Sequence, residues 1–170
     1  MIELNPNDQK FKDISQKEKF KYRIAIKASK NLGVKLSDAV KDFPEIVSED
    51  GDRIVVKSLE GDTSFQKDDY LFFQDKGKGK YWGVAKDIAE DPKRYITEET
   101  DNPKFDKVFI PISPVNAWKV PFEFFVTTPK GKQVSEKDGG WLLQSFIDKD
   151  DIWISSNDDF KNYKIIKGEI

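Results

Sequence analysis

The chain has 170 residues, with 29 Lys or Arg against 31 Asp or Glu, so its formal net charge is −2. It contains neither Cys nor His, which excludes disulfides, thiolate nucleophiles, His-ligated zinc and Ser-His-Asp triads. Its 37% of hydrophobic residues include 13 Phe, 4 Trp and 5 Tyr, so this length predicts a single globular domain spanning residues 1–170.

The chain lacks membrane-targeting features. No apolar run approaches the roughly 20 residues that a membrane-spanning helix needs, and the first residues do not form the apolar core of a signal peptide. A cytoplasmic location is therefore expected. The small net charge creates no field over the whole molecule, so any anion-binding surface must be a local patch.

The segment 16–32 is predicted to be a helix. Ser15 and Glu18 have the spacing of a capping box at its start, and Gly33 stands where a C′ glycine would end it. Four apolar residues recur at a spacing of four and would form one helix face: Phe20, Ile24, Ala28 and Leu32.

A shorter helix is predicted over Ser37–Phe43, ended by Pro44, and the two helices would form a helical N-terminal part, residues 1–45. Between residues 10 and 35 the acidic residues are Asp13 and Glu18. The basic residues of the same stretch are Lys10, Lys12, Lys17, Lys19, Lys21, Arg23, Lys27, Lys30 and Lys35. This excess is typical either of a solvated helix face or of a surface that meets phosphates.

Residues 50–170 are predicted to form a β core. Its centre is a hairpin with strands at 69–74 and 80–88, joined by a link of alternating Lys and Gly. Further strands are predicted at Arg53–Leu59, Val108–Ile112, Val120–Thr127, Ile152–Ser155 and Tyr163–Ile166, while Gly140–Ile147 fits a helix or a strand. Short strands with frequent turns favour an α+β chain with a curled antiparallel sheet or small open barrel and N-terminal helices.

Aromatic residues beside predicted loops suggest a pocket for a flat ligand. Trp82, Tyr95, Phe105 and Trp118 are the predicted wall, with Trp141 the next candidate, and the alternative is that these rings belong to the core. A base gripped by such rings gains about 1–3 kcal/mol from stacking. The hairpin lysines Lys76, Lys78 and Lys80 are predicted to contact phosphates.

No catalytic residue, metal site or cofactor is predicted. The rival enzymatic interpretation is a metal-dependent nuclease. Its D-x-K pattern occurs at Asp91-Pro92-Lys93 and at Asp159-Phe160-Lys161, although both lie in predicted loops. Asp-rich pairs such as Asp150-Asp151 lack the spacing of a calcium loop and are interpreted as solvated turns.

The middle of the chain resembles the EVE and YTH branch of the PUA-like fold. Tyr70–Phe73, Gly83–Lys86 and Val108–Pro121 take the places of its "VFLIF" strand, its "GVAE" strand and its Pro-containing strand. The opening "FLIKS" strand is similar to Arg53–Ser58 (RIVVKS) or to Ile24–Ser29 (IAIKAS). In the second case the predicted helix over 16–32 could not form.

The resemblance implies a non-enzymatic reader of modified bases. Such domains accept a flipped, methylated base in an aromatic cage, and this chain also resembles the DNA-recognition region of McrB-type restriction systems. The expected partner is then methylated double-stranded DNA, with a motor or nuclease module elsewhere in the system. An RNA-binding module, a protein-binding module and the nuclease remain the alternatives.

Overall fold

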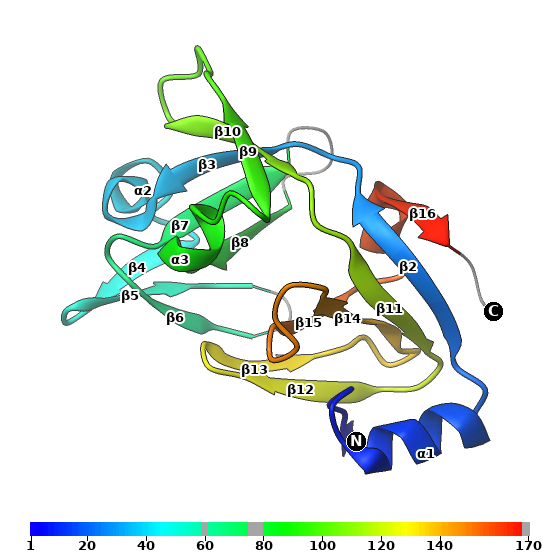
Figure 1. Ribbon diagram of the computed structural model, residues 1–170. Coiled ribbons are helices and arrows are strands. Elements are labelled where there is room, and N and C mark those ends of the chain that lie inside the picture. The colour runs from blue at the N-terminus through cyan, green and yellow to red at the C-terminus, as the bar shows by residue number, and fades with distance from the viewer. Residues whose placement is uncertain (59–60, 75–79, 168–170) are drawn as a thin grey trace. The chain divides into compact units, whose positions relative to one another are not determined.

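The computed structural model describes residues 1–58, 61–74 and 80–167, and the chain divides into two compact units (Figure 1). Unit 1 combines Met1–Ala28 with Ser113–Ile170, and unit 2 is the continuous segment Ser29–Ile112. Strands predominate, and they form small, mainly antiparallel sheets. The prediction of antiparallel β structure is confirmed at this level.

Unit 1 contains two sheets. The larger is antiparallel, in the order β15 (Ile152–Ser155), β14 (Gly140–Ser145), β11 (Val115–Val120), β2 (Lys21–Lys27) and β16 (Tyr163–Lys167). In the smaller sheet, β12 (Phe124–Thr128) lies between β1 (Ile2–Glu3), which is parallel to it, and β13 (Gly131–Val134), which is antiparallel. The unit also holds helix α1 (Gln9–Lys17) and the 3₁₀ turn η1 (Asp159–Asn162).

Alternate residues of a strand point to opposite sides of its sheet. In the larger sheet of unit 1, the residues on each side pack into an apolar cluster. On one face, Leu142 and Ile154 pack with Phe11 of α1 and with Phe124 of β12. On the other face, a second apolar cluster gathers around η1: Ala25, Val115, Ala117, Trp141, Leu143 and Phe160.

Unit 2 is also built from two antiparallel sheets. The larger has the order β8 (Tyr81–Val84), β7 (Tyr70–Gln74), β3 (Asn31–Lys35), β10 (Lys107–Pro111) and β9 (Tyr95–Glu98). The smaller is a meander of β4 (Val47–Asp50), β5 (Arg53–Val56) and β6 (Thr63–Gln66). Helices α2 (Leu36–Asp42) and α3 (Lys86–Ala89) complete the unit.

Alternation along β7 separates two apolar clusters in unit 2. Leu71 and Phe73 leave one face and pack with α2 and the β4–β5–β6 sheet. Tyr70 and Phe72 leave the opposite face and pack with α3, Trp82 and Phe109. The candidate site described below lies on this second face.

The predicted helix over 16–32 is wrong. Helix α1 ends at Lys17, and the following residues form β2 and β3. Ser15 lies inside α1, where its hydroxyl donates to the Lys12 carbonyl at 3.0 Å instead of capping a helix. The spacing of four suited a helix, but Tyr22, Ile24 and Ile26 also alternate as in a strand. The segment forms a strand because β2 pairs with β11 on one edge and with β16 on the other.

Most other predicted elements are confirmed. Helix α2 matches the predicted helix, and β7 pairs antiparallel with β8 as the hairpin requires. The ambiguous segment from Gly140 is strand β14, whereas the end of the second hairpin strand is helix α3. Within the described residues, no helix is long and apolar enough to cross a bilayer.

Candidate functional site

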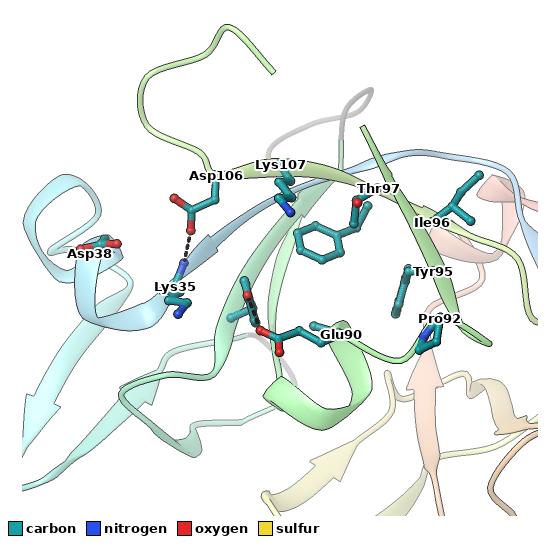
Figure 2. A pocket seen from close by; sticks show the side chains of 12 residues that line it. Lys35, Asp38, Glu90, Pro92, Tyr95, Ile96, Thr97, Asp106 and Lys107 are labelled. Carbon is teal, nitrogen blue, oxygen red and sulfur yellow. Dashed lines mark hydrogen bonds between the residues drawn. The ribbon is translucent and has the colours of Figure 1, made fainter. Parts of the chain in front are cut away.

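An open cleft of about 690 Å³ lies within unit 2, on the face of the large sheet that carries Tyr70 and Phe72. Its lining includes three aromatic rings, those of Tyr70, Tyr95 and Phe109. It also includes three carboxylates, those of Asp38, Glu90 and Asp106. Figure 2 shows Lys35 and Asp106 on one side of the cleft, Tyr95 on the other and Glu90 below them.

Strand register brings the aromatic floor together. The ring of Phe109 lies 5.4 Å from that of Tyr70 and 6.1 Å from that of Tyr95, in edge-to-face geometries. Gly33 of β3 makes room for this ring, because a Cβ at Gly33 would stand 2.5 Å from Phe109 Cε1. Gly33 therefore serves close packing under the cleft instead of ending a helix.

Two hydrogen bonds hold the polar groups of the cleft. The Tyr70 hydroxyl donates to Glu90 Oε2 at 2.7 Å, and burial together with this carboxylate raises the pKa of Tyr70 above its ordinary value. The backbone N–H of Lys35 donates to Asp106 Oδ2 at 3.2 Å. The cleft thus offers carboxylate acceptors beside flat apolar faces, with Lys35 and Lys107 adding positive charge to its lining.

A buried amide without a partner lies next to the cleft floor. Asn31 is fully buried, and neither polar atom of its side chain has a hydrogen-bond partner among the described residues. Asn31 pairs with Phe109, and Phe109 pairs with Thr97, so all three side chains leave the same face of the sheet. Phe109 and Thr97 both line the cleft.

Two of the four predicted pocket aromatics lie on this face. Trp82 and Tyr95 both pack against Phe72, with ring centroids 6.2 Å and 5.5 Å away. Tyr95 lines the cleft, whereas Trp82 belongs to the supporting cluster.

The other two predicted aromatics lie elsewhere. Phe105 packs with Phe43 and Phe73 on the opposite face of the same sheet. Trp118 belongs to unit 1, where it contacts Phe11 and Tyr22. The structure therefore does not gather Phe105 and Trp118 into the cleft that contains Tyr95.

The predicted phosphate-binding lysines are only partly described. Lys76 and Lys78 lie outside the described residues. Lys80 precedes β8, and its carbonyl accepts the N–H of Gln74 at 3.0 Å, closing the described end of the hairpin. The basic residues between 10 and 35 are distributed over α1, β2, β3 and the links between these elements.

Trp141 and the acidic residues of the two D-x-K segments lie outside the cleft. Trp141 is 8% exposed and stacks on Phe160, with ring centroids 3.9 Å apart. Asp91 accepts the N–H of Lys93 and lies 3.6 Å from the guanidinium of Arg94, and Asp159 lies in η1. Among the residues that the structure describes, no three acidic side chains are placed to share a metal ion.

Sequence reasoning missed most of the cleft. It found Tyr95 but did not single out Phe109, Tyr70, Glu90 or Asp106 as ligand contacts. Alternation of Tyr70 and Phe72 along one face was a readable signal. The pairing of β3 with both β7 and β10, which brings these residues together, has no signature in a single sequence.

Comparison of the chain with protein-family models, with curated proteins and with solved structures yields no match. The functional argument therefore depends on the geometry of the chain itself.

Proposed function

We propose that the chain is a nucleic-acid-binding protein that accepts a flipped, methylated base of double-stranded DNA in the cleft of unit 2. The observation that carries the proposal is the combination of aromatic rings with carboxylate acceptors in one open cleft. Base flipping costs a few kcal/mol, and stacking of about 1–3 kcal/mol per base offsets this cost.

The ring faces and the carboxylates have separate roles in this proposal. Tyr95, Tyr70 and Phe109 provide the apolar surround for the base and its methyl group. Glu90 and Asp106 can accept hydrogen bonds from an exocyclic amine, as Asp and Glu accept from the N4 amine of cytosine. Bases that carry an exocyclic amine are therefore the proposed class, which includes cytosine and adenine and leaves out thymine.

Selectivity for a methylated base requires more than burial of the methyl group. One buried methyl contributes about 0.8 kcal/mol, which gives only a few-fold preference. The remaining preference would come from a close aromatic fit and from a carboxylate that orients the base edge. Lys35 and Lys107 are the proposed phosphate contacts of the cleft.

The resemblance to the EVE and YTH branch supports the same ligand class. In this proposal the β8-β7-β3-β10-β9 sheet takes the role of the curled PUA-like sheet, and the chain is the targeting module of a restriction system. DNA cleavage would then belong to a separate motor or nuclease module.

A binding panel tests the proposal. Fluorescence anisotropy would compare duplexes containing one 5-methylcytosine, N4-methylcytosine or N6-methyladenine with the unmodified duplex. Tyr95→Ala should reduce binding of the preferred duplex to the unmodified level while leaving non-specific binding in place. Phe105→Ala is the matched control, because this ring lies on the opposite face of the sheet and should not affect the preference.

Two results would overturn the proposal. The first is a folded Tyr95→Ala protein that retains the full preference. The second is a wild-type protein that binds no duplex of the panel at low salt.

A further inference from the structure

Unit 1 contains a second open groove, of about 610 Å³, whose lining combines aromatic and basic side chains. Trp118, Tyr22 and Phe20 supply the rings, and Lys19 and Lys21 are the charged residues of the described lining. The groove therefore differs from the cleft of unit 2, in which carboxylates accompany the rings.

The rings of this groove are held in place before any ligand arrives. Trp118 and Tyr22 are directly paired on β11 and β2, with centroids 5.4 Å apart, and Phe11 packs edge-on against Trp118 at 5.2 Å. The Tyr22 hydroxyl donates to Asn116, whose amide donates to Gln144 at 3.3 Å. Rings that are already ordered lose little entropy when a ligand binds.

The lysines of the groove lack anionic partners. Lys21 stands directly opposite Lys119 in the β2–β11 pair, and like charges in this arrangement repel. No ion pair involves either of them, or Lys19, within the described part of the chain. Lys19 and Lys21 are thus the cations of the groove lining that a bound anion would meet.

Lys19 also occupies a costly backbone conformation. Its φ of +53° is the only positive φ of a non-glycine residue in the described ranges. Lys19 is the C′ residue that ends α1, because the N–H of Phe20 donates to the Ser15 carbonyl at 2.9 Å across it. Glycine would adopt this conformation without strain.

We propose that this groove is a stacking site for an unpaired nucleotide of a DNA strand, with the base against Trp118 and the adjoining phosphates against Lys19 and Lys21. The inference rests on the proposed function only in taking DNA as the ligand, and it does not use the cleft of unit 2. Because every base has a flat face, the contact adds affinity without base preference.

Labelled oligo(dT) tests this groove separately, since thymine lacks the exocyclic amine that the cleft of unit 2 is proposed to bind. In anisotropy titrations Trp118→Ala should lower the affinity for oligo(dT) by about tenfold, the size of one lost stacking contact. Phe105→Ala, which removes a ring that lines neither the cleft nor the groove, should leave this affinity unchanged. Circular dichroism would show that both variants are folded.

A lysine series keeps the test valid if Trp118→Ala fails to fold. Lys19→Gly should raise the melting temperature, because it removes the positive-φ strain, and should still weaken binding of oligo(dT). Lys19→Gly and Lys21→Gln should each reduce the slope of log affinity against log salt by about 0.7, the value for one phosphate of a single strand. Lys137→Gln, at an exposed lysine outside the groove, should change neither quantity.

Several outcomes would overturn the inference. An unchanged slope of log affinity against log salt in both lysine variants would show that neither lysine contacts a phosphate. Equal competition by polyglutamate would show that charge alone is recognised, and equal competition by thymidine monophosphate would make a free nucleotide the ligand. An unchanged affinity for oligo(dT) in a folded Trp118→Ala protein would overturn this inference alone, whereas a retained methyl-base preference in a folded Tyr95→Ala protein would overturn the cleft alone.

Discussion

Asn31 buries a side-chain amide whose polar atoms have no hydrogen-bond partner among the described residues, which lowers the stability of the folded chain. A buried polar group without a hydrogen bond costs about 1–3 kcal/mol, and such groups are rare in native proteins. Asn31 lies on the sheet face that carries the proposed base site, next to Phe109. Residues that reduce stability without an evident structural return are expected at functional sites.

Replacing Asn31 by Leu should therefore stabilise the protein. The two side chains have the same branching and the same number of heavy atoms, so the change mainly removes the unpaired polar atoms. We expect the free energy of unfolding, measured in urea, to rise by about 1 kcal/mol or more.

Asn116→Leu is the control for this prediction, because the Asn116 amide has hydrogen bonds with Tyr22 and Gln144. It should lower the free energy of unfolding. A loss of stability in Asn31→Leu would mean that the Asn31 amide has a partner after all, such as a bound water.

Lys27 should make stability depend on pH. Burial lowers the pKa of Lys27 to about 7, partly opposed by the Asp159 carboxylate. Between pH 7 and 10.5 the Lys27 side chain is protonated in the unfolded chain but not in the folded chain. The contribution of Lys27 to the free energy of unfolding therefore rises with pH over this range. Its destabilising effect is complete below pH 7 and disappears near 10.5.

Lys27→Met removes this term. The gain in melting temperature over the wild type should be largest near pH 6.5 and should shrink steadily toward pH 10. Thermal scans of both proteins in matched buffers measure the difference, which cancels the other titrating groups. A gain that is constant with pH would contradict the prediction.

At the scale of elements, the contact between β3 and β10 depends on Gly33. Gly33→Ala should destabilise the protein by about 1–3 kcal/mol, because the new Cβ would overlap the buried Phe109 ring. Adding Phe109→Leu should recover part of this loss, since a smaller side chain leaves space for the methyl group. Chemical denaturation of the single and double variants gives the coupling, and strict additivity would argue against the overlap.

Element type was predictable where side-chain chemistry and pairing agree. The β-branched run from Ile54 and the aromatic runs at β7 and β8 became strands, and Pro44 follows α2 as expected. The stretch from Phe20 to Leu32 failed because its apolar residues satisfy both a helical and an alternating period. Neighbouring strands that are remote in sequence decided between them.

The candidate site was less predictable than the strands. Tyr95 was found because an aromatic residue beside a polar loop suggests a ligand contact. Glu90 and Asp106 could not be chosen among 31 acidic residues without knowing which strands are neighbours. Placing Asp106 requires the pairing of β10 with β3, and placing Glu90 requires the packing of α3 against β7.

At the scale of the whole molecule, unit 2 is one continuous segment that contains every partner of its own described strands. The fragment Ser29–Ile112 should therefore fold alone, with a β-type circular dichroism spectrum and a cooperative urea transition. A fragment that remains unfolded would favour the single domain over 1–170, which stays a prediction. Calorimetry of the intact chain complements this measurement by showing one transition or two.

The insertion of unit 2 between the two halves of unit 1 has a consequence for synthesis on the ribosome. Strand β2 is made early, yet its neighbours β11 and β16 are made only after the whole of unit 2. In that interval β2 is a nascent strand with two open edges, which can pair with other chains. Lys21, Arg23 and Lys27, at alternate positions along it, place positive charges on one face, and their mutual repulsion would discourage two waiting chains from joining there.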